Sequence, residues 1–486
     1  MPLTRRDFVK QSTIAAAAIG FPMLASSRVL GANEEICMGV AGLGIRGSQA
    51  HIPSFASQKG VSILAVSDPD KARLQRVAAD VQKKYGRKAD QYVDMREMFD
   101  RKDIDAVSNA TMNYWHALST IWACRRGKHV YVEKPLAHYI WEGRQMVNAA
   151  RKYKRLVQVG TQYRSLKGHV DLAKWLAAGN LGRVQFVTCV ANKPRLPIGK
   201  RQEPLPIPDT VDYDLWCGPA AKGPVYRNNL QYDCSFDWSM GDGESCNQGV
   251  HEVDVARWIL GYETLPRRTM SIGGRFFVND AGNVPNTQII YYDYPEVPIL
   301  YELHNLPKAK QFLTPNKPQN YTRNMPGFHG MATGVSVQCE GGYTLALDVY
   351  DNQGKKIKSF PARDENHFAN FIKALRSGRQ DDLNAEVLKG HISTAICHVG
   401  NISYRLGKPA SAEEQRRQVG QIACWKEVHQ RFLKYLDDIG EDPGTATLGP
   451  WLEVDSEKEC IRNNDEANKI VKGVYRAPYV VPDLSS

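Results

Sequence analysis

The sequence predicts an α/β protein of two domains: an N-terminal doubly wound parallel sheet, then an α+β domain with a largely antiparallel open sheet. The chain has 486 residues, which is enough for two hydrophobic cores. Its first third alternates short apolar runs with stretches of helical period, which is typical of β-α-β units. Beyond Arg183 the apolar runs lengthen and are separated by loops rich in proline and glycine, which favours an antiparallel sheet.

The local patterns place the expected elements of both domains. In the first domain, strands are expected at residues 36–41, 61–67, 106–110, 130–132 and 156–159, with helices near 47–58, 70–84, 116–126 and 141–153. In the second domain, strands are expected at 184–191, 270–278, 288–292, 334–339 and 343–350, followed by helices at 365–376, 384–406 and 412–436. Two loops, 194–208 and 307–326, are long enough to act as lids.

The N-terminus resembles a twin-arginine export signal, with Arg5 and Arg6 as the pair and Phe8 and Lys10 at the positions that the motif requires. The apolar stretch that follows is too short for a membrane span and contains a glycine and a proline. We therefore expect a signal peptide over residues 1–32 and export of the folded protein to the periplasm. The alternative is a chance amphipathic N-terminus on a cytoplasmic enzyme.

A glycine-rich loop of the pattern G-x-G-x-x-G joins the first strand to the first helix. Its residues are Gly42, Gly44, Ile45, Arg46 and Gly47, with Leu43 between the first two glycines. In this position the glycines let a dinucleotide pyrophosphate approach the N-terminus of a helix. We therefore predict a Rossmann dinucleotide-binding domain over residues 33–165, an α+β substrate and oligomerisation domain over 166–450, and an extended tail over 451–486.

Asp68 closes the second strand, where an acidic side chain can accept hydrogen bonds from the adenosine ribose and repel a 2′-phosphate. This favours NAD over NADP. Arg46 and Lys71 lie nearby in the sequence and would suit a phosphate instead. The structural alternative for Asp68 is a cap on the helix that follows Pro69.

Lys134 follows Glu133 at the end of another short apolar strand, and Pro135 comes next. Strand ends on this side of a doubly wound sheet face the ligand crevice. A lysine there can hydrogen-bond a substrate hydroxyl and assist its deprotonation, and burial would lower its pKa toward the range useful for acid–base catalysis. The alternative is an ordinary surface lysine in a strand-end turn.

Asn247 and His251 stand four residues apart, so both side chains would project from the same face if one helix covers them. His251 is then a candidate general base that Asn247 orients. Two structural alternatives remain: His251 as a half-buried core histidine, and Asn247 as a helix cap.

Charge and cysteine content exclude several other classes of function. The formal net charge is +11, but residues 1–32 contribute +3 of it, and the remaining basic residues are scattered along the chain. This pattern predicts a solvated surface and no nucleic-acid site. The ten cysteines contain no C-x-x-C pair, so the spacing predicts neither a metal site nor a small disulfide framework.

With these motifs, the chain resembles the Gfo/Idh/MocA oxidoreductases, the superfamily of glucose–fructose oxidoreductase and inositol dehydrogenase. The resemblance rests on the glycine loop, on residues 110–116, on Glu133-Lys134-Pro135, and on Gly249-Val250-His251 with Asp254. Within that superfamily the chain looks most like the exported twin-arginine subgroup. Many relatives have an aspartate where this chain has Asn247, and an asparagine cannot take up a proton.

The resemblance implies a set of site residues. Lys134 and His251 would flank the reacting carbon, with Asn247 beside them. Besides the glycine loop and Asp68, the expected cofactor contacts are Ala110, Thr111, Trp115, His116, Glu133 and Lys134. The expected substrate contacts are Gln162, Tyr163, Arg164, Asn192, Lys193 and Asp254.

The sequence therefore predicts an exported NAD(P)-dependent oxidoreductase that oxidises a secondary hydroxyl of a sugar, polyol or glycoside by hydride transfer to a tightly bound nicotinamide. One alternative is an NAD-dependent glycosidase that acts by transient oxidation at C3 and elimination. The other is a sugar-binding protein with weakened catalysis. We expect a homo-oligomer through the C-terminal sheet, no membrane span and no bound metal.

Overall fold

The computed structural model describes residues 35–314, 318–363 and 365–485. The signal peptide predicted over residues 1–32 lies outside this range, so it stays a prediction. Within the described residues, no helix combines the length and the apolar character needed to cross a membrane.

Six parallel strands form the first sheet, in the order β3-β2-β1-β4-β5-β6. They are β1 (Ile36–Ala41), β2 (Val61–Ser67), β3 (Asp90–Tyr92), β4 (Ala106–Asn109), β5 (His129–Val132) and β6 (Val157–Val159). The strand order reverses between β1 and β4, and a doubly wound sheet opens its ligand crevice at the carboxyl ends of the strands on either side of such a reversal. The predicted Rossmann arrangement is confirmed.

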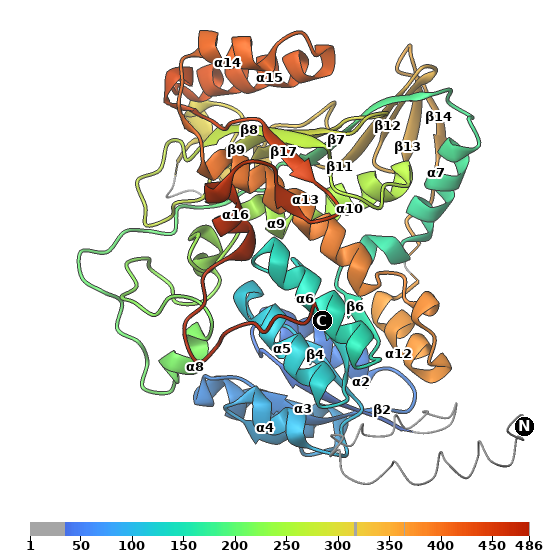
Figure 1. Cartoon of the computed structure of the whole chain (residues 1–486), viewed down its shortest axis with the longest axis vertical. Helices are drawn as coiled ribbons and strands as arrows, with labels where there is room; N and C mark the ends of the chain where they lie inside the picture. The colour runs from blue at the N-terminus through green and yellow to red at the C-terminus, as the bar shows by residue number, and fades with distance from the viewer. Residues whose placement is uncertain (1–34, 315–317, 364, 486) are drawn as a thin grey trace, which may run out of the picture.

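Helices cover both faces of this sheet, in blue to cyan in Figure 1. One face packs against α4 (Met95–Asp100), α5 (Asn113–Arg125) and α6 (Ile140–Lys152). The other packs against α2 (Ile52–Ala56), α3 (Lys71–Tyr85) and, from the far end of the chain, α12 (His367–Ser377). Alternate residues of β1, including Met38 and Val40, reach this second face. The C-terminal half of the chain therefore completes the core of the N-terminal domain.

The second sheet is mixed and mostly antiparallel, as predicted. Ten of its strands follow the order β14-β13-β12-β11-β7-β10-β9-β8-β16-β15, and β17 (Leu452–Asp455) pairs with β8 and with β18 (Cys460–Ile461). The outer strands of this order are β14 (Lys356–Ser359), β13 (Asp348–Asp351), β12 (Gly342–Leu345), β16 (Thr447–Leu448) and β15 (Lys408–Pro409). The central strands are β11 (Thr333–Cys339), β7 (Val184–Ala191), β10 (Ile299–His304), β9 (Thr287–Asp293) and β8 (Arg268–Gly274). Among these, β7 and β10 run parallel to each other.

Helices cover both faces of the central strands. In Figure 1, α13 (Val387–Arg405) and α10 (Gly249–Leu260) lie between the two sheets, and α15 (Ala423–Ile439) lies on the outer side. Along β9, Ile290 and Tyr292 pack toward α10 and α13, whereas Ile289 and Tyr291 pack toward α15. Every residue of β9 is consequently buried.

Three expected elements differ from the observed ones. Residues 343–350 form a hairpin of β12 (Gly342–Leu345) and β13 (Asp348–Asp351), because Ala346 turns the chain at a positive φ of 50°. The helix expected at 412–436 divides at Gly420, with a φ of 67°, into α14 (Ala412–Val419) and α15. The tail expected to be wholly extended contains β17, β18 and α16 (Asp465–Lys472) before it straightens.

The last residues return from the second domain to the first. Arg476 donates to the carboxylate of Asp214 at 2.8 Å, and the Tyr479 hydroxyl donates to the same carboxylate at 3.1 Å. The Tyr479 ring meets Trp115 of α5 edge-on, with 5.3 Å between ring centroids. The backbone N–H of Leu484 donates to Gln145 of α6 at 2.7 Å. The C-terminal segment therefore braces the outer helices of the Rossmann domain.

We predict that Tyr479→Ala lowers the free energy of unfolding by about 3 kcal/mol, because it empties a buried aromatic site against Trp115. The neighbouring Val480 is 51% exposed, so Val480→Ala serves as the matched control and should have little effect. Urea unfolding of both variants measures the difference. Equal stability of the two variants would show that the C-terminal segment contributes nothing to the Rossmann domain.

Candidate active site

The glycine loop lies at the carboxyl end of β1, and two of its glycines have no room for a side chain. Gly42 has a φ of 82°, and a Cβ there would lie 2.6 Å from the backbone of Ala110 and Thr111. A Cβ on Gly47 would lie 1.9 Å from the carbonyl oxygen of Gly42. Ile45 at the top of the loop is 77% exposed. The loop has the tight turn and close backbone approach that dinucleotide binding requires.

Asp68 supports this loop from the end of β2. Its carboxylate accepts hydrogen bonds from the backbone N–H of Leu43 at 2.7 Å and of Asp70 at 2.9 Å. The cap of α3 is instead Asp70, which accepts from Ala72 and Arg73, so the capping alternative for Asp68 is wrong. Asp68 also lines a pocket. The other predicted cofactor contacts that line it are Gly42, Gly44, Ala110, Thr111 and Trp115.

Glu133, at the end of β5, is the centre of a buried polar network. Its Oε1 accepts from His51 Nε2 at 2.9 Å and from Arg46 Nε at 2.7 Å, and its Oε2 accepts from the backbone N–H of Lys134 at 3.3 Å. Burial by itself would raise the pKa of Glu133, but His51 and Arg46 outweigh burial and lower it. His51 Nδ1 meets the hydroxyl of Ser108 at 2.6 Å. Arg46 is therefore paired with a carboxylate, which disfavours its use for a 2′-phosphate.

Lys134 reaches across from the Rossmann sheet to the second domain. Its Nζ donates to the backbone carbonyl of Asn247 at 2.6 Å and to the side-chain Oδ1 of Asn247 at 2.9 Å. Burial lowers the pKa of Lys134, an effect that Glu133 opposes only in part. A neutral amine would keep both of these donors and still present a lone pair, so the arrangement suits proton uptake.

The structure corrects the expected pairing of Asn247 with His251. Helix α9 (Gly243–Asn247) ends at Asn247, and α10 begins at Gly249. The backbone N–H of His251 bonds to the carbonyl of Gln248 at 3.0 Å, which leaves the Asn247 carbonyl available to Lys134. Asn247 therefore holds Lys134, and its side chain is not a cap for α10.

The amide nitrogen of Asn247 has acidic and aromatic partners that sequence spacing did not indicate. Its Nδ2 donates to both carboxylate oxygens of Glu244 at 3.1 Å and to the Tyr232 hydroxyl at 3.3 Å. Glu244 in turn makes a two-point ion pair with Arg195, with both distances 2.8 Å. Because Nδ2 faces a carboxylate, the orientation of the Asn247 amide is settled, and Oδ1 must face Lys134.

His251 is buried, and within the described part of the chain its Nδ1 has no hydrogen-bond partner. Its ring packs on Tyr163, with centroids 5.1 Å apart. Burial, together with the positive charge of Lys134, lowers the pKa of His251 to about 3. The imidazole is therefore neutral near pH 7, and its free nitrogen suits a hydrogen bond to a substrate hydroxyl better than the uptake of a proton.

Two of the predicted cofactor contacts, Trp115 and His116, use their ring nitrogens for hydrogen bonds to backbone carbonyls of the protein. Trp115 donates from its ring nitrogen to the carbonyl of Leu215 at 3.0 Å. His116 is buried, with Nδ1 2.8 Å from the carbonyl of Pro135 and Nε2 3.1 Å from the carbonyl of Thr111. His116 thus links the backbone beyond Lys134 to the end of β4.

Arg164 and Asp254 form a buried ion pair, although they were expected to contact substrate. Asp254 accepts from Arg164 Nε at 2.8 Å and Nη2 at 2.9 Å, and from the Ser393 hydroxyl at 2.5 Å. Burial would raise the pKa of Asp254, but the charge of Arg164 outweighs burial and lowers it. Arg164 and Asp254 bind each other rather than face a substrate. Together with Ser393 they connect α10 to α13 and to the residues after β6.

The remaining predicted substrate contacts keep polar atoms available. Among the described residues, Gln162 Oε1 and Asn192 Oδ1 are buried without a partner. Lys193 Nζ donates to Gln248 Oε1 at 3.1 Å, and Gln248 Nε2 donates to Glu252 at 2.9 Å. Burial raises the pKa of Glu252 to about 8.

Sequence reasoning missed His51, Glu244, Gln248, Glu252 and Arg195. The helical spacing of Gln248 and Glu252, four residues apart beside His251, was the one available signal. The other three have no local pattern that points to the site.

We predict that Asp254→Asn destabilises the protein by about 3–5 kcal/mol, because it leaves the Arg164 guanidinium buried without its anion. The matched control is Asp171→Asn, which removes an exposed i,i+4 pair with Lys167 and should cost about 0.5 kcal/mol. Thermal unfolding measures both variants. If Asp254→Asn keeps its stability and only weakens substrate binding, the ion pair has no structural role.

Comparison with known proteins agrees with this geometry. Residues 36–161 match the model of an oxidoreductase family with an NAD-binding Rossmann fold, GFO_IDH_MocA. An inositol 2-dehydrogenase of Saccharopolyspora erythraea is 28% identical over 232 residues, which is 48% of this chain and 56% of that protein. A glycosyl hydrolase family 109 protein of Shewanella sp. (strain ANA-3) is 33% identical over 123 residues, which is 24% of this chain and 27% of that protein.

The chain thus spans about half the length of the first relative and about a quarter of the second. A crystal structure of an oxidoreductase from Thermotoga maritima shares the fold, with a TM-score of 0.55, 15% identity, and coverage of 76% of this chain and 96% of that one. The family match confirms NAD as the expected cofactor. Over residues 36–161 the chain therefore matches the NAD-binding Rossmann domain of the Gfo/Idh/MocA oxidoreductase family.

Proposed function

We propose that the protein is an exported NAD-dependent oxidoreductase that oxidises a secondary hydroxyl of a sugar, polyol or glycoside. The observation that carries this proposal is the position of Lys134. Lys134 follows β5 next to Glu133, which binds Arg46 of the cofactor loop, and Asn247 holds the Lys134 amine through two acceptors. The inositol dehydrogenase relative supports the substrate class.

The residues of this chain would divide the reaction as follows. The glycine loop and Asp68 would hold NAD, which would supply a hydride acceptor for the carbinol carbon. The neutral amine of Lys134 donates its two N–H bonds to Asn247 and takes the hydroxyl proton on its lone pair, which leaves a carbonyl product. His251 stays neutral and orients the hydroxyl through Nδ1. The Glu133 network fixes the backbone of Lys134 throughout.

The amide at position 247 matters for this division. Burial lowers the pKa of Lys134, and an uncharged neighbour does not reverse that effect. An aspartate in the same place would stabilise the ammonium form and reduce the fraction of free base. The asparagine that departs from many relatives therefore favours Lys134, rather than His251, as the proton acceptor.

Export and cofactor retention belong to the same proposal. The arginine pair Arg5-Arg6 supports folded export, which would carry the bound nucleotide out of the cytoplasm. Because free NAD is scarce there, a second carbonyl substrate would return the hydride within the same site. The proposed homo-oligomer would use the C-terminal sheet where α15 does not cover it.

A glycosidase that oxidises C3 transiently is the second candidate, and the family 109 relative supports it. The two functions share the hydride step and differ in the net product. Cleavage of p-nitrophenyl glycosides without net reduction of nicotinamide supports the glycosidase. Reduction of nicotinamide by a free sugar or inositol supports the dehydrogenase. A sugar-binding protein would show neither.

We predict that Lys134→Met slows nicotinamide reduction in a single turnover by about 10²–10⁴-fold, because it removes the proton acceptor. Nucleotide released on denaturation should remain mainly NAD in the same amount as in the wild type. Myo-inositol, glucose and p-nitrophenyl glycosides serve as the test substrates. The exposed Lys88 supplies the control variant Lys88→Met, which should react like the wild type. A loss of only a few-fold in Lys134→Met would place the chemistry elsewhere.

We also predict that Asn247→Asp moves the rising limb of the pH–rate profile to higher pH. Oxidation needs the free amine, so the rate rises as pH passes the pKa of Lys134, and a carboxylate at position 247 raises that pKa. Below the new pKa the rate falls by about tenfold for each unit of the shift. Asn247→Ala removes the acceptor without adding charge and serves as the reference. An unchanged profile with a lower melting temperature would leave Asn247 a purely structural residue.

A further inference from the structure

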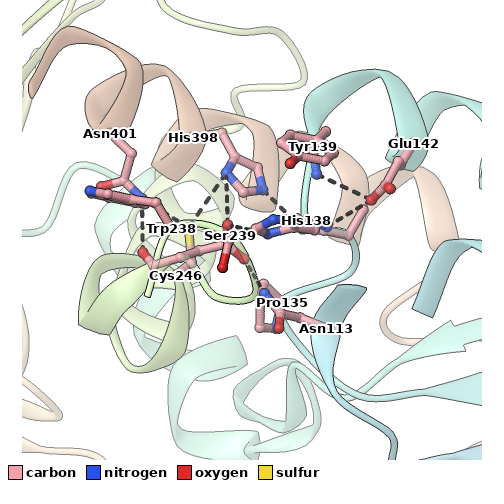
Figure 2. Close-up of polar contacts among 12 residues, drawn as sticks. Asn113, Pro135, His138, Tyr139, Glu142, Trp238, Ser239, Cys246, His398 and Asn401 are labelled. Atoms are coloured by element: carbon pink, nitrogen blue, oxygen red, sulfur yellow. Dashed lines mark hydrogen bonds and ion pairs between the residues drawn. The ribbon is translucent and has the colours of Figure 1, made fainter. Parts of the chain in front are cut away.

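A second cluster of polar side chains, outside the proposed chemistry, includes Cys246, His398 and Asn401, which Figure 2 shows close together. Asp242 precedes α9, Cys246 lies within α9, and His398 lies in the middle of α13. The Nδ1 of His398 is 3.8 Å from Cys246 Sγ and 3.9 Å from Asp242 Oδ1. Cys246 is fully buried, and Asp242 and His398 are 5% and 6% exposed. A carboxylate, a thiol and an imidazole therefore converge in the interior.

The imidazole of His398 is oriented in the way that metal-binding histidines are. Its Nε2 lies 2.9 Å from the carbonyl oxygen of Ala137, which can only accept, so Nε2 carries the hydrogen. Nδ1 faces Cys246 and Asp242, and a metal ion bound there would take the place of its proton. Histidines that ligate metal ions almost always donate their other N–H to a carbonyl or carboxylate in this way.

The other two groups are oriented by neighbours that donate hydrogen bonds. Asn401 Nδ2 donates to Cys246 Sγ at 3.5 Å, and the Ser245 hydroxyl fixes the Asn401 amide by donating to its Oδ1 at 2.8 Å. Asp242 accepts from His138 Nδ1 at 2.8 Å and from the amide of Asn113. Such donors stabilise the anionic forms, thiolate and carboxylate, that metal ligands require.

We propose that Asp242, Cys246 and His398 bind one divalent transition-metal ion, and that zinc fits the site. Ligand atoms around tetrahedral zinc lie about 3.3–3.6 Å apart. Here His398 Nδ1 is 3.8 and 3.9 Å from the other two ligand atoms, and all three lie within 4.8 Å of one another, so the side chains would move closer together around an ion. Thiolate and imidazole ligands favour zinc over magnesium or calcium. One thiolate and one carboxylate also balance the charge of a divalent ion in the interior.

A small cavity beside two of the three side chains, Asp242 and His398, offers a position for a fourth ligand. His138, Asp242 and His398 line a small cavity of about 10 Å³, which is room for one water molecule. His138 Nε2 is buried and has no partner among the residues that the structure describes. A water in this cavity would complete the metal sphere and meet that nitrogen.

The site would act as a brace rather than as a second catalytic centre. Ala137 and His138 follow the Lys134-Pro135 turn, and Cys246 directly precedes Asn247, the partner of Lys134. A metal ion here would lock α9 and α13 to that turn. No atom of Lys134 takes part, so the metal proposal can fail or hold independently of the proposed function.

The test is made on the full chain, purified without a metal-affinity tag, by elemental analysis of bound metals. The expected result is close to one zinc per chain, lost in Cys246→Ser and in His398→Gln. Cys124→Ser changes another buried cysteine, in α5, and should keep the metal, as should Lys134→Met. Removal of the metal with a chelator should lower the melting temperature of the wild type but not of Cys246→Ser.

Cobalt substitution makes the test independent of how the variants fold. Wild-type protein stripped with a chelator and titrated with Co²⁺ should develop a thiolate-to-cobalt absorption band that saturates at one equivalent. The same titration of Cys124→Ser should give the band, and that of Cys246→Ser should not. The proposal is overturned if the wild-type protein takes up no cobalt, or takes it up without the thiolate band. The three side chains would then be linked by hydrogen bonds alone.

Discussion

The buried carboxylate of Glu133 is the interaction on which the rest of the site depends. It accepts from His51 and Arg46, which belong to the loop and helix that follow β1, and from the backbone of Lys134 at the end of β5. One anion therefore ties the cofactor loop to the proposed proton acceptor. Because a buried carboxylate is costly without partners, this arrangement also demands that the loop and the strand end stay together.

The second domain completes the site from across the sheet. The contact between Lys134 and Asn247 joins the Rossmann sheet to α9, and the buried ion pair of Arg164 and Asp254 joins α10 to α13 and to the end of β6. Burial lowers the pKa of both Lys134 and His251, and a positive charge on Lys134 lowers the pKa of His251 further. The site therefore has one amine suited to exchange a proton and one neutral imidazole suited to orient a hydroxyl.

Much of the fold was predictable because most of its strands and helices have a recognisable local sequence pattern. Alternating apolar runs and helical stretches predicted every strand of the first sheet except β3, which has three residues and exposed side chains. In the second domain, strands buried on both faces lack a clear alternation, and β10 was missed for that reason. The hairpin of β12 and β13 turns at Ala346 in a left-handed conformation. An alanine rarely adopts that conformation, so the sequence contained no signal for the turn.

The sequence by itself determined the Rossmann domain, its glycine loop and the position of Lys134, because each depends on residues adjacent in the chain and on strand order. Only the tertiary structure decided the partners of the long polar side chains. Helical spacing associates Asn247 with His251, but the boundary between α9 and α10 leaves the backbone carbonyl of Asn247 without a helical partner. Lys134, 113 residues away in the sequence, donates a hydrogen bond to that carbonyl. Asp242, Cys246 and His398 likewise share no local motif, since Cys246 and His398 stand 152 residues apart. Contacts between side chains that far apart in the sequence depend on how the helices pack, so they cannot be predicted from residue spacing.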